Sequence, residues 1–93
     1  MDELSETLRA LADPSRRKQL MHLAQGRATS GQLASILPMS RPAGSQHLSV
    51  LVAADLVRTS PAGRERWHEL NPERLQRAHS WLGKLLEDWS TGE

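Results

Sequence analysis

The 93-residue sequence contains no cysteine, no phenylalanine and no tyrosine. A chain without cysteine has no disulfide, thiolate metal ligand or thiol redox sensor, which fits the reducing cytoplasm. Its aromatic residues are three tryptophans, too few for the stacking platforms with which proteins bind single-stranded nucleic acid. No apolar run approaches the length of a transmembrane helix, and the acidic start lacks the basic and apolar regions of a signal peptide. We therefore expect a cytoplasmic protein with no membrane contact.

Charge is distributed unevenly, although the net charge is only +1. Both ends of the chain are acidic, whereas ten of the twelve Lys and Arg residues lie between Pro14 and Leu82. No Asp or Glu occurs from Pro14 to Ala54. A basic middle between acidic ends indicates a polyanion as the partner of the middle. Random drift of surface charge is the alternative.

Two helices are predicted at the start of the chain. Leucines at helical spacing predict the first over residues 2–12, with acidic residues in its first turn. Asp13-Pro14 is a cap followed by proline, which predicts that a second helix begins there. Gly26 is a plausible stop for that helix, near residue 25.

A helix-turn-helix is predicted at about residues 30–54. Thr29 and Gln32 match a capping box at the start of a short third helix. Pro38 prevents that helix from continuing, and Ser40 caps a fourth helix over residues 41–54. Two short helices joined by a tight turn have the helix-turn-helix shape.

A β-hairpin and a last helix complete the predicted fold. Residues 56–60 and 64–70 carry strand signals, and Pro61-Ala62-Gly63 between them has turn chemistry, so a wing is expected at about residues 56–70. Asn71-Pro72 then opens a helix over residues 72–89. The expected fold is mainly α with a small two-stranded wing, in the order α-α-α-α-β-β-α. Residues 1–93 form one winged helix-turn-helix domain in this interpretation.

The two terminal helices carry more apolar surface than so small a core needs. Steps of three and four residues along the last helix have the spacing of a coiled-coil seam. We therefore predict a symmetric homodimer, with a self-contained monomer as the alternative. The predicted interface residues are Leu4, Leu8, Leu11, Leu75, Ala78, Leu82, Leu85 and Trp89.

The order of elements resembles the bacterial winged helix-turn-helix repressors of the ArsR type. The resemblance is carried by "LADPSRRKQLMHLA" (11–24), "MSRPAGSQHLSVLVAADLV" (39–57) and "GRERWHEL" (63–70). The chain is similar to the small, cysteine-free members rather than to the metal sensors. The resemblance implies a homodimeric repressor that binds double-stranded DNA at an operator near its own promoter. It also implies that helix 41–54 enters the major groove, that the wing reaches a minor groove or the backbone, and that an effector releases the dimer from DNA. An unidentified small molecule is one candidate for that effector, and the absence of any small-molecule inducer is the alternative.

The residue types on the fourth helix and the wing suit contact with DNA. If Leu48 and Leu51 face inward, helical geometry turns the polar side chains of residues 41–49 outward. Arginine can bind guanine and glutamine can bind adenine in the major groove, while serine can bind a phosphate or a base edge. Arginines beside the wing turn suit phosphates or the minor groove, with ordinary exposed arginines as the alternative. The predicted DNA contacts are Ser40, Arg41, Ser45, Gln46, His47, Ser49, Arg64 and Arg66. For His47 the equal alternative is a helix-packing histidine bonded to a nearby backbone group, and for the basic run Arg16-Arg17-Lys18 a solvated face is as plausible as DNA contact.

Three positions depart from the pattern of the family. Relatives usually carry a branched aliphatic residue at Gly44, often Lys at Ser49, and Gly at Asp55. These departures predict weaker DNA affinity or a stronger reliance on base contacts. One hypothesis is that Gly44 lets the helix start loosely and firm up on DNA, so that Gly44→Val would stabilise the free protein. The alternative is that a neighbour packs closely against Gly44.

No enzyme, metal or cofactor is expected. The sequence has no nucleophile motif, no Gly-rich phosphate loop and no close carboxylate pair in an apolar setting. The positions that match the cysteine site of metal-sensing relatives are Thr29 and Gly31, and the four histidines have no ligand spacing. A zinc site shared across a dimer is the alternative. The competing function is a winged-helix protein-interaction or dimerisation module without sequence-specific DNA binding, which should expose apolar or acidic residues at 41–49.

Overall fold

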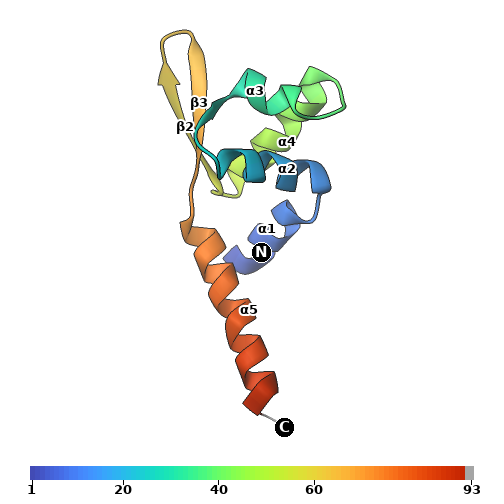
Figure 1. Cartoon of the computed structure of the whole chain (residues 1–93), viewed down its shortest axis with the longest axis vertical. Helices are drawn as coiled ribbons and strands as arrows, with labels where there is room; N and C mark the ends of the chain where they lie inside the picture. Colours follow the sequence, from blue (N-terminus) through green and yellow to red (C-terminus); the bar gives the residue numbers. More distant parts are fainter. Residues whose placement is uncertain (92–93) are drawn as a thin grey trace.

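The computed structural model describes residues 1–91 of the chain (Figure 1). The elements within that range are α1 (Glu3–Leu11), α2 (Pro14–Leu23), β1 (Ala28–Thr29), α3 (Ser30–Ser35), α4 (Arg41–Ala53), β2 (Val57–Ala62), β3 (Glu65–Leu70) and α5 (Glu73–Thr91). The structure confirms a mainly helical fold with a β-hairpin wing after the fourth helix. The element bounds differ from those predicted by only a few residues.

The helices begin where side chains can satisfy their free backbone N–H groups. Asp2 accepts a hydrogen bond from the Ser5 N–H at the start of α1 (2.7 Å). Asp13 accepts from the N–H groups of Ser15 and Arg16 at the start of α2. Both hydrogen bonds of the predicted capping box on α3 are present. Local capping chemistry therefore fixes the starts of these helices.

The sheet has a third strand that the sequence did not reveal. Its order is β1-β3-β2, and β1 pairs Ala28 with His68 and Thr29 with Trp67. A two-residue strand carries no alternation, so only its partner forty residues later defines it. Arg27, just before β1, lies with its guanidinium 4.5 Å from the centre of the Trp67 ring.

The wing turn lies later than predicted. Ala62 pairs with Glu65, so the loop is Gly63-Arg64 rather than Pro61-Ala62-Gly63, and Pro61 belongs to β2. Gly63 has a φ of 65° and stands at the first loop position, as glycine does in two-residue hairpin loops of type II′. Proline is tolerated in β2 because β2 is an edge strand.

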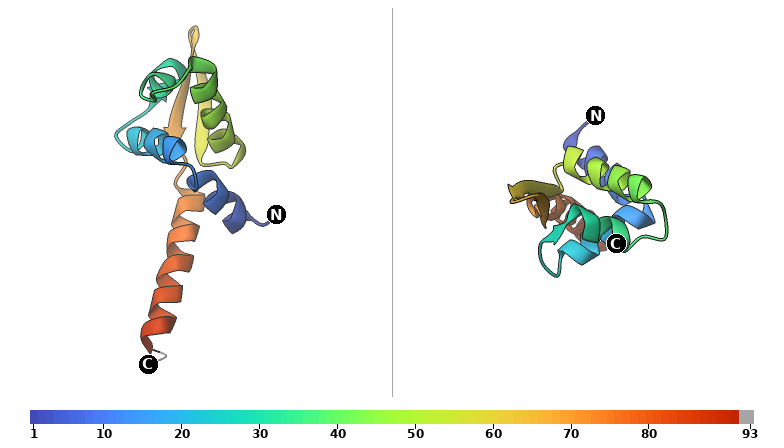
Figure 2. Two further views of the ribbon diagram at one scale, coloured as in Figure 1. Left: turned by 90° about the vertical axis from the view of Figure 1, so that its right-hand side faces the viewer. Right: turned by 90° about the horizontal axis from the view of Figure 1, so that it is seen from above.

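The core lies between the helices and the base of the wing. Leu20, Leu33, Leu48, Leu51 and Leu56 are all buried in one apolar cluster. α5 leaves this body and extends away from it, so the wing tip and the far end of α5 lie at opposite ends of the described structure (Figures 1 and 2). The longest dimension is 55 Å.

Candidate nucleic-acid interface

α4 presents a polar face on the side away from the core. Ser40 caps this helix by accepting a hydrogen bond from the Ala43 N–H, and Leu48 and Leu51 are buried beneath it. The side chains predicted to contact DNA from this helix are exposed, with the exception of His47: Ser40, Arg41, Ser45, Gln46 and Ser49. The Ser49 hydroxyl donates to the Ser45 carbonyl oxygen (3.0 Å), which leaves its own oxygen free to accept. The face carries no acidic side chain from residue 41 to residue 53.

Gly44 lies where α3 and α4 come into close contact. A Cβ added at Gly44 would stand 3.1 Å from Ala34 Cα and 3.2 Å from Ala34 Cβ. The buried Gln19 amide donates to the carbonyl oxygens of both Leu33 and Gly44 (3.1 Å each) and so joins the two helices. These contacts support close packing at Gly44 and do not support a loose start of α4. The two helices of the helix-turn-helix are thus in direct contact at Gly44 and are joined through Gln19.

His47 faces α2 rather than the outer side of α4. Its Nδ1 lies 3.7 Å from Asp13 Oδ2 and 3.4 Å from Arg16 Nη1, and its side chain is 24% exposed. This position favours the helix-packing alternative, although the partners are side chains and not a backbone group.

Two residues of the basic run at the start of α2, Arg16 and Arg17, have a structural role. Arg16 donates to the carbonyl oxygens of Ala10 (2.7 Å) and Arg9 (3.0 Å), and Arg17 donates to that of Leu11 (2.7 Å). These carbonyl groups lie in the last turn of α1, where backbone carbonyls commonly lack an intrahelical partner, and that of Arg9 also accepts from the Ala12 N–H (3.2 Å). The two arginines therefore cap α1, and cations are favoured at such a helix end.

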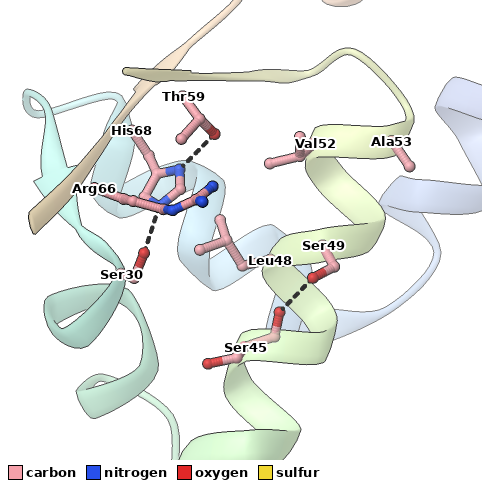
Figure 3. Close-up of a pocket in the computed structure, with 9 residues that line it drawn as sticks. All are labelled: Ser30, Ser45, Leu48, Ser49, Val52, Ala53, Thr59, Arg66 and His68. Atoms are coloured by element: carbon pink, nitrogen blue, oxygen red, sulfur yellow. Dashed lines mark hydrogen bonds between the residues drawn. The ribbon is translucent and has the colours of Figure 1, made fainter. Parts of the chain in front are cut away.

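The wing places two arginines beside the outer face of α4. Arg64 lies in the exposed loop and Arg66 on β3. Arg66 lines a hollow between α4 and the base of the wing (Figure 3). The other residues that line this hollow are Ser30, Ser45, Leu48, Ser49, Val52, Ala53, Thr59 and His68. The structure thus brings the predicted serines of α4 and one predicted wing arginine to a single surface.

His68, at the base of the wing, has hydrogen-bond partners on both sides. Its Nε2 lies 2.6 Å from Ser30 Oγ and its Nδ1 lies 2.9 Å from Thr59 Oγ1, and the residue is 4% exposed. Burial, followed by the nearby positive charge of Arg66, lowers the pKa of the His68 imidazole below its ordinary value. Sequence reasoning missed this arrangement because its three members lie in three separate segments.

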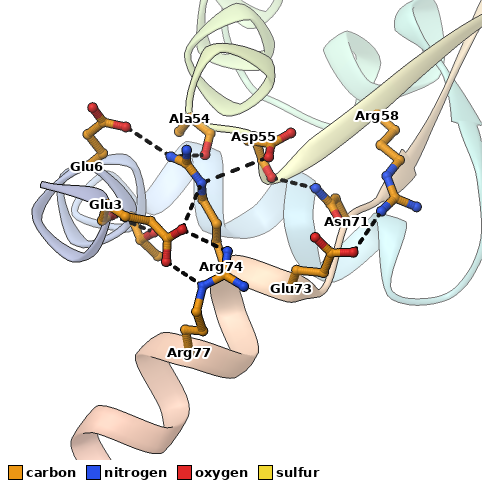
Figure 4. Close-up of polar contacts among 10 residues, drawn as sticks. Glu3, Glu6, Ala54, Asp55, Arg58, Asn71, Glu73, Arg74 and Arg77 are labelled. Carbon is orange, nitrogen blue, oxygen red and sulfur yellow. Dashed lines mark hydrogen bonds and ion pairs between the residues drawn. The ribbon is translucent and has the colours of Figure 1, made fainter.

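Ion pairs hold α1, α5 and the end of α4 together (Figure 4). Arg74 donates to Glu6 Oε2 (2.9 Å) and to the Ala54 carbonyl oxygen (3.0 Å). Arg77 binds both carboxylate oxygens of Glu3 (2.6 and 2.7 Å), which lowers the pKa of the Glu3 carboxyl group. The contacts of Arg74, which lies on α5, therefore link the end of α4 to α1 and α5.

The predicted dimer residues divide into two groups. Leu11 and Leu75 pack against the core of their own chain, and Ala78 is buried. Leu4 is half-buried, whereas Leu8 is exposed. Farther along α5 the apolar side chains are exposed: Trp81, Leu82, Leu85, Leu86 and Trp89.

The described part of the chain shows no membrane-spanning or metal-binding arrangement. None of its helices is both long and apolar enough to cross a bilayer. Within residues 1–91, no three His, Cys, Asp or Glu side chains gather as a metal site would require.

Comparison with known proteins identifies the family. Residues 13–59 match the model of the bacterial regulatory protein family arsR. The chain is 51% identical over 83 residues to the HTH-type transcriptional regulator Rv2034 of Mycobacterium tuberculosis, covering 89% of this chain and 78% of that protein. It is 32% identical over 79 residues to the transcriptional repressor SdpR of Bacillus subtilis, covering 85% and 88% of the two chains.

Solved structures agree with this result. The crystal structure of an ArsR family transcriptional regulator, RHA00566, superposes with a TM-score of 0.88 at 32% identity and covers 96% of this chain and 98% of the other. A winged helix-turn-helix DNA-binding domain of Mycobacterium bovis superposes with a TM-score of 0.73 at 23% identity and covers 94% and 81%. At 23% identity, the superposition on the Mycobacterium bovis domain supports the fold alone. The chain therefore belongs to the ArsR family of bacterial regulatory proteins and is a winged helix-turn-helix transcriptional regulator, not an enzyme.

Proposed function

We propose that this protein binds double-stranded DNA as a homodimer and represses transcription from a palindromic operator. The observation that carries the proposal is the exposed, acid-free face of α4 beside the wing arginines. In this arrangement Gln46 reads a base edge in the major groove, and Arg41, Ser40, Ser45 and Ser49 bind phosphates or base edges. Arg64 and Arg66 contact the backbone or the minor groove from the wing.

His47 has a supporting place in this proposal. Its partners on α2 hold the middle of α4 against the second helix. A histidine in that position helps to set the angle between α4 and α2, and so the angle at which α4 meets DNA.

The exposed apolar side chains of α5 are the proposed dimer interface. Trp81 is 47% exposed, Leu85 52% and Trp89 69%, and monomeric proteins rarely leave so much contiguous apolar surface in water. Leu8 on α1, together with Leu82 and Leu86, extends this surface. Leu4 lies at its edge, while Leu11, Leu75 and Ala78 hold α1 and α5 to the rest of the chain. A two-fold dimer places two copies of α4 on half-sites about one helical turn apart, roughly 34–36 Å.

The proposed function divides the chain between DNA reading and dimerisation. Residues 1–93 act as one winged helix-turn-helix domain, with DNA read by residues 30–70 and dimerisation by the terminal helices. A protein with this role works in the cytoplasm, where bacterial DNA lies. An effector that releases the dimer from DNA would be a further partner.

Selection of bound fragments from genomic DNA with the purified protein tests the function. We expect enrichment of an inverted repeat, including a site upstream of the protein's own gene. Recovery of fragments without a shared sequence would contradict the operator. A failure to retain any duplex at low salt would favour the protein-interaction module.

A further inference from the structure

A second hollow, lined by three arginines, lies between α3 and the wing. It lies on the other side of Ser30 and is lined by Thr29, Ser30, Gly31, Arg41, Arg64, Glu65 and Arg66. It shares Ser30 and Arg66 with the hollow in Figure 3. Three arginines and a single acidic residue, Glu65, therefore line the same hollow as Ser30.

Gly31 leaves room for one of these arginines. A Cβ added at Gly31 would stand 2.6 Å from Arg41 Nη2, so the Arg41 guanidinium lies directly against the first turn of α3. The guanidinium thus lies against Gly31, the residue that follows Ser30, and Arg41 lines the same hollow as Ser30. Arginine in such a place binds a phosphate with charge-assisted hydrogen bonds.

We propose, on the basis of the function above, that this region seats one backbone phosphate of the bound duplex, and that His68 orients the Ser30 hydroxyl to donate to it. His68 is a positioning residue here, since it is buried behind Ser30. The ligand is a phosphodiester group, which is the same in every DNA sequence.

Hydrogen-bond direction explains why a histidine would serve here. A neutral imidazole has one N–H donor and one acceptor nitrogen, while a hydroxyl can donate only one proton. If Ser30 donates to Nε2, its proton is not available to a phosphate. If Nε2 carries the proton, Ser30 accepts from the ring and points its own proton outward, and Thr59 donates to Nδ1. A bound phosphate selects the second arrangement.

The same geometry links DNA binding to protonation of His68. A protonated ring donates to both Ser30 and Thr59, which frees both hydroxyl protons and adds a positive charge near the phosphate. Among the residues that line the two hollows, Arg64 and Arg66 from the wing and Arg41 from α4 oppose this charge, and Glu65 favours it. A phosphate offsets the arginines and so favours protonation. By linkage, protonation then strengthens DNA binding, by about tenfold for each unit by which DNA raises the His68 pKa.

A fluorescent duplex of mixed sequence at low salt is the probe, because a phosphate contact does not depend on sequence. Ser30→Ala should weaken binding about tenfold to a hundredfold, the range typical of one hydrogen bond to a charged group. Ser35→Ala, at the other end of the same short helix, is the matched control and should bind like the unchanged protein. The Thr29 cap of α3 is intact in both variants.

The pH profile separates the positioning role from a structural one. We expect the affinity of the unchanged protein to rise between pH 7.5 and pH 5.5. His68→Gln keeps an N–H group for Ser30 but cannot titrate, so it should bind normally at pH 7.5 and lose most of this rise. His79→Gln removes an exposed histidine from α5, far from the wing, and should keep the full rise.

Several outcomes would overturn the inference. Unchanged binding of Ser30→Ala, or an unchanged pH profile of His68→Gln, would do so while leaving the proposed function intact. The mixed-sequence duplex could bind with the expected variant effects while the operator selection fails. That result would support the proposed phosphate site and contradict only the proposed operator. Absence of duplex binding at low salt would overturn both.

Discussion

A single glycine decides how closely the two helices of the helix-turn-helix can approach. Because Ala34 Cα stands 3.1 Å from the place of a Cβ on Gly44, a larger side chain there must push backbone and not a flexible side chain end. Gly44→Val should therefore lower the free energy of unfolding by about 1–3 kcal/mol, the usual cost of overpacking. Urea unfolding measures the change.

Gly83 in α5 is the matched control for Gly44. No heavy atom lies within 4 Å of an added Cβ at Gly83, so Gly83→Ala should raise stability by up to about 1 kcal/mol through helix propensity. If Gly44→Val raised stability and increased amide protection over residues 41–46, mobility and not close packing would be the role of Gly44.

Asp55 ends α4 in a conformation that suits glycine better. Its φ is 61°, and the hydrogen bonds Leu56 N–H to Leu51 C=O and Asp55 N–H to Val52 C=O form a Schellman motif. Asp55→Gly should stabilise the protein by up to about 1 kcal/mol because the left-handed conformation costs a non-glycine residue roughly 1–2 kcal/mol.

Asp55→Ala separates the backbone effect from the loss of charge. Both variants lose the long contact to Arg74 (3.9 Å), but only glycine relieves the backbone. Thermal unfolding should rank Gly above Asp and Asp above Ala. Equal stability of the two variants would mean that the φ value carries no cost here.

The residues whose roles follow from local sequence are the ones that were predicted correctly. Thr29 and Gln32 reveal their capping box because the partners are three residues apart. Gly44 and His68 do not reveal their roles in this way, since their partners lie ten and thirty-eight residues away. Sequence spacing shows which face a side chain takes, but not which side chain from another segment meets it.

At the scale of elements, α4 and the wing are expected to make different kinds of DNA contact. Gln46→Ala should cost about 1–3 kcal/mol at one operator base pair and relax selectivity there. Arg64→Ala should weaken binding to all sequences and reduce the slope of log affinity against log salt by about one unit. Titrations at several salt concentrations, with the operator and with one-base variants, distinguish the two effects. An unchanged selectivity for the first variant, or an unchanged slope for the second, would remove that contact.

Arg74 is expected to join three helices as one unit. Its side chain is 21% exposed, and it donates to the Glu6 carboxylate and to the carbonyl oxygen of Ala54, the C-cap residue of α4. Arg74→Ala should cost about 1–3 kcal/mol of stability, since it leaves a partly buried carbonyl and carboxylate without a donor. Arg77→Ala is the control, because its pair with Glu3 is exposed and its loss should cost less. A larger loss for Arg77→Ala in thermal unfolding would contradict this order.

The elements differ in how far the sequence could define them. Caps and prolines mark the starts of α1, α2, α3 and α4, so their positions were close to those observed. The wing was expected, but its turn was placed too early, since Pro61-Ala62-Gly63 looks like a turn until pairing with β3 is known. β1 is a strand only because β3 lies beside it.

At the scale of the whole molecule, α5 is too long and too apolar for the body from which it projects. Packing two copies through this helix would cover the exposed surface of Leu82, Leu85 and Trp89 and would give the two-fold symmetry of a palindromic site. We expect a stable dimer at micromolar concentration by analytical ultracentrifugation. Because assembly and folding are linked, the melting temperature should rise with protein concentration.

A charge on the α5 face should separate the subunits. Leu85→Glu should shift the sedimenting species toward the monomer mass and weaken operator binding, since two half-sites could no longer be held by one assembly. Val52→Glu is the matched control, because Val52 is an exposed valine on α4 that lines the hollow beside the wing. It should remain a dimer while losing DNA affinity through charge repulsion with phosphates. A monomer mass for the unchanged protein would contradict the dimer, and a dimer mass for Leu85→Glu would move the interface away from this face of α5.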